Sequence, residues 1–514
     1  MGAPRFFLST LAPLGAALAL LAACAQAAPA AWPPAWNEPP APQQQQDFTL
    51  PAFEPPSASH CRRLPGTREV PGGGGQWSEG RLRRGLGHAE SAPAAAEDRA
   101  EDRAEGRAEG RAEMAARSMA PAPAATAALP QPAPRIAPRR EAVTAGMVDD
   151  NADFGEYLAY RQRNAGLAVR ERDIAERYLL EVTDAAGRPV HDAEVAVQRA
   201  GRAEPVMWAR TDTAGRVWLH PRAFLAPGVD DRALGIAVRK GAAWSRATLL
   251  RGEQRAALQV RLGGAQNPAQ RARLDLVFLV DATGSMGDEI AKLKASMRAM
   301  AQQIAQLPGQ PDICWGLVAY RDRGDAFLTR THDFTDDLAA FQGVLARVQA
   351  GGGGDTPEAL NEALHETVHR LSWRADAARM VVLVADAPPH LDYGGCMEPP
   401  EAEGFGPPRG QRPGSGRPGA CPQYDIDMQA ALAKGIKLFA VGASGLDPVG
   451  EYVYRQIAQY TAGRFVFLTY KDAADPGSGP GTQTPHDVRG YSVQTLDRLI
   501  VKLVGDELAR LPRG

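Results

Sequence analysis

Two patterns of apolar residues alternate along the last half of the chain. Five nearly uninterrupted apolar runs are typical of strands buried on both faces, and they read LDLVFLV, DICWGLVAY, MVVLVAD, IKLFAVGAS and GRFVFL. Segments with apolar residues at intervals of three and four separate these runs and indicate helices. The alternation predicts an α/β domain over 273–512, with a doubly wound, mostly parallel, Rossmann-like sheet covered by helices on both faces.

Shorter alternating runs come before this domain. YLLEV, AEVAVQ, TDTAGRVWL, LGIAV and LQVRL are separated by turn sequences, and they predict a small all-β sandwich over 170–264. The spacing of apolar residues in DFGEYLAYRQR predicts a short helix over 153–163. The stretch EVTDAAGRPVHDAEVAV resembles transthyretin-like and carboxypeptidase-regulatory-like modules, and this resemblance implies a spacer or recognition module.

The region over 25–145 has few large apolar residues. It is rich in Pro, Ala, Gln, Gly and Arg, and residues 97–112 form the tandem repeat EDRAEDRAEGRAEGRA. Such a segment buries too little apolar surface to offset the entropy lost on ordering. We therefore expect a long disordered N-terminal region that acts as a tether.

The first residues are typical of an export signal. After Arg5 the chain has a short apolar segment that is followed by Ala and Pro. Residues 21–24, Leu-Ala-Ala-Cys, resemble a bacterial lipobox, so we expect 1–24 to be a signal peptide and Cys24 to carry the lipid. An ordinary signal peptide cut a few residues later is the alternative. Either form predicts an exported protein, and the first predicts a membrane-anchored lipoprotein of the cell envelope, in the periplasm or at the cell surface.

The positions of the cysteines and the charge balance allow two further predictions, one on disulfides and one on the class of partner. Cys396 and Cys421 flank a Gly/Pro-rich insertion, and a disulfide between them is plausible in an oxidising compartment. Cys314 lies in an apolar run and is interpreted as a buried free thiol, and Cys61 falls in the tether as an unpaired thiol. The chain has 58 basic and 60 acidic residues with no basic face, so nucleic acid is not expected as a partner.

One apolar run ends in a cluster of oxygen-bearing side chains. LVFLVDATGSM places Asp281, Thr283 and Ser285 within five positions after a predicted strand. A carboxylate with two hydroxyls offers the hard oxygen ligands that Mg²⁺ or Mn²⁺ prefers, and no histidine accompanies the loop to activate a serine nucleophile. Following the chain up and down the predicted sheet brings GGGGDTPEAL and Asp386 to the same edge. The sequence therefore predicts a divalent-metal site there.

The order of DATGS, GGGGDTPEAL and LVADAPPH resembles that of a von Willebrand factor type A domain with a metal-ion-dependent adhesion site. The resemblance implies a non-enzymatic binding protein that uses Mg²⁺, or else Mn²⁺ or Ca²⁺. Carried across motif by motif, it implies the ligands Asp281, Thr283, Ser285, Thr356 and Asp386. It also implies a protein partner that offers an Asp or Glu carboxylate to the ion, in adhesion or in assembly of an envelope complex.

The middle loop leaves an alternative ligand, because Asp355 and Thr356 both follow four glycines. If Asp281 and Asp386 are the only acids, the ion keeps positive charge and an open position for a partner's carboxylate. A third acid, Asp355, would make the site more nearly neutral and would weaken that attraction.

A second motif suggests an enzyme. HETVH matches the H-E-x-x-H pattern of zinc peptidases and would make the chain a zinc-dependent hydrolase that uses His365, Glu366 and His369. The apolar stripe of the same predicted helix lies opposite the two histidines, so they are expected to face solvent, and no third ligand is evident. The RGD at 323–325 is interpreted as turn chemistry.

Overall fold

The structure is a computed structural model, and it describes residues 61–72, 142–200, 202, 204–225, 231–252, 257–265, 271–354, 356–391 and 421–511. The expected signal peptide, the expected lipid site Cys24 and most of the expected tether lie outside these residues. So do Asp355 and Cys396.

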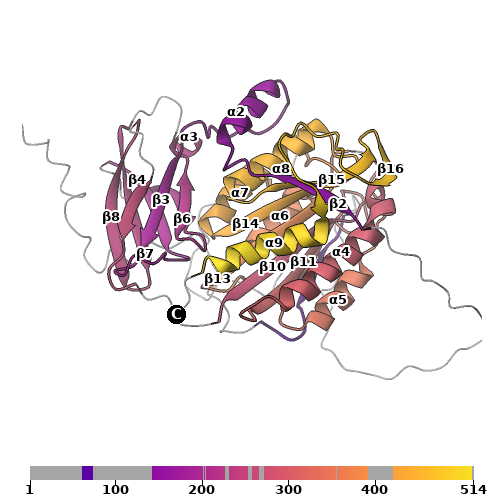
Figure 1. The fold of residues 1–514 in the computed structure, drawn as a ribbon, viewed down its shortest axis with the longest axis horizontal. Coiled ribbons are helices and arrows are strands. Elements are labelled where there is room, and N and C mark those ends of the chain that lie inside the picture. The colour runs from indigo at the N-terminus through magenta and orange to yellow at the C-terminus, as the bar shows by residue number, and fades with distance from the viewer. Residues whose placement is uncertain are drawn as a thin grey trace, which may run out of the picture. The chain divides into compact units, whose positions relative to one another are not determined.

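Ten strands of the described chain form one mixed, mostly parallel sheet (Figure 1). Its order is β1, β12, β11, β10, β13, β14, β15, β2 and β17, with β16 beside β15. The five strands β11, β10, β13, β14 and β15 run parallel in that order, and β12 is antiparallel to β11. The strand bounds are β1 Thr67–Val70, β2 Thr144–Val148, β10 Arg273–Asp281, β11 Asp312–Tyr320, β12 Thr329–Thr335, β13 Ala377–Ala385, β14 Ile436–Gly442, β15 Phe465–Asp472, β16 Asp475–Pro480 and β17 Gln494–Thr495.

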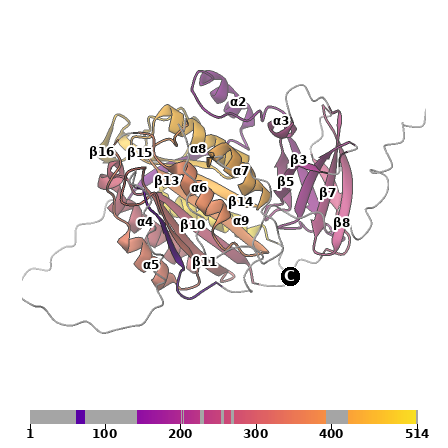
Figure 2. The same cartoon turned by 180° about the vertical axis from the view of Figure 1, so that it is seen from behind.

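Helices cover both faces of this sheet (Figure 1, Figure 2). One apolar cluster joins one face to α4 Gly287–Ala305, α5 Leu338–Arg347 and α9 Leu496–Ala509. The other cluster joins the opposite face to α6 Leu360–His369, α7 Tyr424–Ala433 and α8 Pro448–Tyr460. The predicted α/β architecture is therefore confirmed.

The central strands are apolar on both sides because both sides are packed. In β10, Leu276, Phe278 and Val280 belong to the cluster with α4, α5 and α9, whereas Val277 and Leu279 belong to the other cluster. Successive side chains of a strand point to opposite faces, so an uninterrupted apolar run is what a strand between two helical layers requires.

Two smaller sheets precede the central one. The first has the order β6 Arg216–Leu219, β3 Tyr178–Thr183 and β9 Leu258–Arg261, and the second has β5 Pro205–Arg210, β4 Glu194–Arg199, β7 Ala233–Lys240 and β8 Ala243–Leu250. The short helix α3 Pro221–Phe224 follows β6, and α2 Phe154–Arg163 matches the helix expected over 153–163. The predicted short strands are present, and their arrangement as a transthyretin-like sandwich stays a prediction.

Buried ion pairs connect these smaller sheets to the central one. Asp192, which precedes β4, is 3% exposed in its side chain and accepts from Arg379 of β13 at 2.9 Å. The same carboxylate accepts from Arg210 of β5 at 3.0 Å. Thr213 Oγ1 donates to Glu507 of α9 at 2.8 Å. The contacts are polar and buried, so their loss leaves charges without partners.

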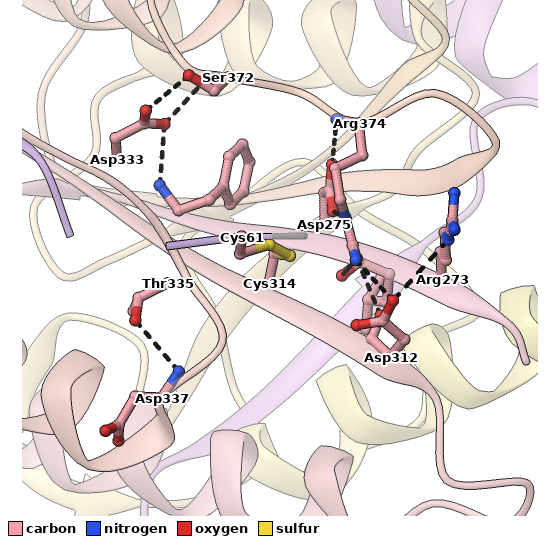
Figure 3. The surroundings of a disulfide bond; sticks show 12 residues. Cys61, Arg273, Asp275, Asp312, Cys314, Asp333, Thr335, Asp337, Ser372 and Arg374 are labelled. Atoms are coloured by element: carbon pink, nitrogen blue, oxygen red, sulfur yellow. Dashed lines mark hydrogen bonds and ion pairs between the residues drawn. A yellow bond between two sulfur atoms is a disulfide. The ribbon is translucent and has the colours of Figure 1, made fainter. Parts of the chain in front are cut away.

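A segment of the expected tether belongs to the folded unit. Strand β1 pairs antiparallel with β12 and forms one edge of the sheet, and Cys61, just before it, forms a disulfide with Cys314 of β11 (Figure 3). The two Cα atoms are 6.1 Å apart although 253 residues separate them in the sequence. The interpretation of Cys314 as a free thiol and of Cys61 as unpaired was wrong, because strand pairing brings the two sulfurs together.

Two further findings concern the cysteines and the membrane. Cys421 is disulfide-bonded, and its expected pairing with Cys396 stays a prediction, because Cys396 lies outside the described residues. Within the described ranges, no helix has both the length and the apolar character that crossing a bilayer requires.

Candidate metal centre

The first predicted ligands lie at the carboxyl ends of two neighbouring strands. Strand β10 ends at Asp281, and its parallel neighbour β13 ends one residue before Asp386, with Val280 paired to Val384. This register brings the two acids to the same edge of the sheet, as the sequence predicted. Asp281 is completely buried and Asp386 is 8% exposed.

Local hydrogen bonds fix the first loop, which we define as residues 282–286. Thr283 donates to Asp281 Oδ1 from its backbone nitrogen at 2.9 Å and from its hydroxyl at 2.6 Å. The hydroxyls of Thr283 and Ser285 lie 3.1 Å apart. Asp281 and Thr283 are buried, whereas Ser285 is exposed. The side-chain oxygens of these three residues therefore extend from the interior to the surface.

Backbone contacts hold the middle loop, residues 351–354 and 356–358, against the first loop. Gly284 donates its N–H to Gly352 O at 2.9 Å, and Gly351 donates to Ala282 O at 3.0 Å. A Cβ at Gly284 would lie 2.7 Å from Gly352 O, which explains why glycine occupies this position. The loops that carry the expected ligands therefore approach each other closely.

Asp325 of the RGD sequence supports the middle loop. Its Oδ2 accepts from the backbone N–H of Gly353 at 2.8 Å and from that of Asp322 at 3.1 Å. Its carboxylate is thus used inside the fold, which agrees with the interpretation of RGD as turn chemistry.

The middle loop brings an acid that sequence reasoning missed. Thr356 is exposed, and Asp355 lies outside the described residues, whereas Glu358 is 3% exposed. Glu358 donates its backbone N–H to Pro388 O at 3.0 Å, which joins the middle loop to the loop after β13. A Cβ built on Gly353 would lie 2.9 Å from Glu358 Oε1 and 3.2 Å from the Thr283 Cβ, so Glu358 faces the first loop.

Three buried carboxylate oxygens at this edge have no hydrogen-bond partner among the described residues. They are Asp281 Oδ2, Glu358 Oε2 and Asp386 Oδ1. Leaving such an oxygen without a partner costs about 1–3 kcal/mol or more for a charged group. A buried carboxylate oxygen without a hydrogen-bond partner is a place where a cation could bind, and these oxygens are the strongest structural indication of a metal site.

The electrostatics of the centre agree with that indication. Burial, and then the neighbouring Asp386, raise the pKa of Asp281 to about 7. Burial, followed by Asp281, Asp322, Asp325 and Asp386, raises the pKa of Glu358 to about 9. Burial also raises the pKa of Asp386, which a hydrogen bond from Ser285 opposes. These carboxylates repel one another, and a divalent cation would reverse that effect.

The donor chemistry suits a hard cation. Carboxylates and hydroxyls are the ligands that Mg²⁺ and Mn²⁺ prefer, and the candidate ligands Asp281, Thr283, Ser285, Glu358 and Asp386 all offer oxygens. The residues therefore fit the ion that the sequence predicted, with Glu358 added to the group.

The HETVH motif has a different geometry from that of a zinc peptidase. Leu360, Leu364 and Val368 of α6 are completely buried, as expected of the core stripe. Glu366 is also buried on the side of the sheet, where it pairs with Arg68 of β1 and accepts from Thr331 at 3.4 Å. The glutamate that would act as the base is therefore engaged away from His365 and His369.

The chain is similar to known proteins over part of its length. Residues 275–390 match the family model described as von Willebrand factor A domain. An alpha-protein kinase, vwkA, from Dictyostelium discoideum is 31% identical over 119 residues, which are 23% of this chain and 19% of that protein. An ariadne-like RING finger protein from Acanthamoeba polyphaga mimivirus is 34% identical over 125 residues, which are 23% of this chain and 12% of that protein. The chain thus spans less than a fifth of the length of either relative.

Two solved structures are also similar. A conserved hypothetical protein, BatB, from Bacteroides thetaiotaomicron is 12% identical, with a TM-score of 0.28, and the match covers 47% of this chain and all of that one. A von Willebrand factor type A protein from Catenulispora acidiphila is 12% identical, with a TM-score of 0.24, and the match covers 54% of this chain and 50% of that one.

Proposed function

Because residues 275–390 form a von Willebrand factor A domain, we propose that this chain is a binding protein that captures a protein partner through a divalent metal. The observation that carries the proposal is the set of three unpartnered, buried carboxylate oxygens at one edge of the sheet. Asp281, Asp386, Thr283 and Ser285 would hold Mg²⁺ or Mn²⁺. The ion would supply a positive charge at the rim of the domain, where Ser285 and Thr356 are exposed.

Glu358 is the proposed acidic group of the middle loop. It is buried beside the first loop, whereas Thr356 is exposed, so its carboxylate lies closer to the buried part of the centre. Thr356 remains a ligand candidate on the outer side. The partner would offer an Asp or Glu carboxylate to the exposed side of the ion, and Glu358 would moderate how strongly the ion attracts it.

The location of the protein also stays a proposal. The apolar N-terminal segment and Cys24 support export and lipid attachment. The Cys61–Cys314 disulfide supports the same compartment, because disulfides persist in oxidising surroundings and are rare in the cytosol. We propose a membrane-anchored protein of the cell envelope that has no catalytic role of its own.

The metal is tested on the purified chain by calorimetric titration with Mg²⁺ and Mn²⁺. Asp281→Asn keeps the oxygen that accepts from Thr283 and removes the charge, so it should weaken binding at least about tenfold. Asp506→Ala is the matched control, because its carboxylate pairs with Lys502 on the exposed side of α9. Wild-type protein that binds neither ion, or an Asp281→Asn variant that binds as tightly as wild type, would contradict the proposal.

The partner's chemistry is tested with immobilised peptides that differ only in a central Asp or Asn. The Asp peptides should retain the wild-type chain in Mg²⁺ and release it in EDTA, and Asp281→Asn should abolish retention. Glu358→Gln removes one negative charge beside the ion and should strengthen retention. Equal retention by Asp and Asn peptides would reject the carboxylate, while leaving the metal site itself intact.

A further inference from the structure

A second cluster of metal-ligating side chains lies between α6 and α7, apart from the oxygen centre. His365 Nδ1 lies 3.1 Å and His369 Nε2 lies 2.9 Å from Asp427 Oδ1. The two imidazole rings, one helical turn apart on α6, have their centroids 4.4 Å apart. The ligand atoms of all three residues lie within 4.8 Å of one another, as a single ion would require.

Asp427 is the most buried of the three residues in the cluster. Its side chain is 3% exposed, and its Oδ2 has no hydrogen-bond partner among the described residues. The two histidines are about one third exposed, with 37% for His365 and 32% for His369. Asp427 therefore directs one buried oxygen, Oδ1, at two imidazoles that reach solvent, while its other buried oxygen, Oδ2, has no partner among the described residues. This arrangement resembles a metal site that is closed on the protein side and open to solvent.

We propose that His365, His369 and Asp427 bind a Zn²⁺ ion that links α6 to α7. Two imidazole nitrogens and one carboxylate form a ligand set that zinc accepts, whereas Mg²⁺ prefers oxygen alone. Three protein ligands leave a fourth position for water or for a group of another molecule. This site is independent of the proposed oxygen centre.

The site binds zinc without the base of a peptidase. In the H-E-x-x-H arrangement the glutamate stands beside the metal as general base. Here the Glu366 side chain is buried and is engaged by Arg68 and Thr331. The ion therefore fixes the position of α7, which begins three residues after Cys421, against α6.

The test measures Zn²⁺ bound to the full chain in the presence of saturating Mg²⁺, so that the oxygen centre is occupied. Metal analysis after dialysis against micromolar free Zn²⁺ should find one zinc per wild-type chain, and bound zinc should raise the melting temperature. His365→Gln and His369→Gln change side chains that are partly exposed, so both variants should fold. Each should lower zinc affinity at least about tenfold, since losing even a group that only hydrogen-bonds to a metal ligand costs about 10- to 100-fold.

Asp427→Asn removes the third ligand and should lower zinc affinity at least as much. Asp425→Asn is its matched control, because Asp425 is a buried carboxylate of the same helix turn that pairs with Arg172. Circular dichroism checks that each variant is folded. Wild-type protein without bound zinc would overturn the proposal, and so would histidine variants that bind zinc as tightly as wild type. Asp281→Asn should leave zinc binding unchanged, which separates this site from the proposed function.

Discussion

Gly284→Ala should separate the two loops that form the oxygen centre. The added Cβ would lie 2.7 Å from Gly352 O, and ordinary contact begins at 3.4 Å, so the atoms must move apart by about 0.7 Å. Gly284 also donates to the same carbonyl oxygen at 2.9 Å, and this hydrogen bond would lengthen beyond its normal range. Thr283 and Gly353 adjoin the two contacting residues, so the displacement reaches the expected ligands.

The shift is large compared with the tolerance of a metal site. Overpacking of this kind costs about 1–3 kcal/mol, and coordination distances are maintained to about ±0.2 Å. Mg²⁺ also demands near-ideal octahedral geometry at about 2.0–2.1 Å. We therefore expect Mg²⁺ affinity to fall at least about tenfold, which corresponds to about 1.4 kcal/mol.

Gly287→Ala is the control for this change. Gly287 lies three residues later in helical conformation, and no atom lies within 4 Å of a Cβ added there. The Gly287→Ala variant should therefore bind Mg²⁺ like wild type. Calorimetric titration measures the affinity, and urea denaturation in EDTA measures the stability without metal. Gly284→Ala with wild-type affinity and wild-type stability would show that the loops are not in close contact, and the geometric reasoning would be wrong.

Two further predictions concern buried titratable side chains away from the oxygen centre. His220 is completely buried against Tyr460, and burial lowers its pKa to about 3. Below about pH 6.5 His220 is protonated in the unfolded chain but stays neutral in the folded chain. Its contribution should therefore lower the free energy of unfolding by about 2 kcal/mol at pH 5. His220→Phe should flatten this pH dependence in urea denaturation, and an unchanged slope would exclude the assignment. Asp192→Asn should cost about 3–5 kcal/mol, since Arg379 would lose a buried partner, whereas Asp506→Asn at an exposed pair should hardly change stability.

The pattern of apolar runs was sufficient to predict the central sheet and two of the acids. Strands buried on both faces have few polar positions, so β10 and β13 stand out in the sequence, and each ends at or just before an acid. Parallel neighbours end at the same edge, which places Asp281 beside Asp386. The edge strand β1 was missed because four residues within a Pro- and Gly-rich region carry almost no periodic signal.

Two contacts could not be predicted because the sequence separates their members. Cys61 and Cys314 are 253 residues apart, and Asp427 follows His369 by 58 residues, across the insertion.

Glu358 is close to the expected middle-loop ligands, yet an acid before a helix is ordinarily read as favourable to the helix dipole. Its burial, its backbone bond to Pro388 and the approach of its carboxylate to Gly353 show that it faces the centre. A search for glutamate within the glycine-rich loop motif would have found this candidate.

Glu358 also changes the charge balance on which the proposed partner depends. If Asp281, Asp386 and Glu358 are all ionised, they carry one more negative charge than a divalent ion neutralises. Without the ion, burial and mutual repulsion raise the pKa of Asp281 to about 7 and that of Glu358 to about 9, so protons occupy part of the centre at neutral pH. Metal must therefore displace protons. Once bound, it attracts a partner's carboxylate less strongly than an ion held by two acids would, so the partner must also gain binding energy from the surrounding surface.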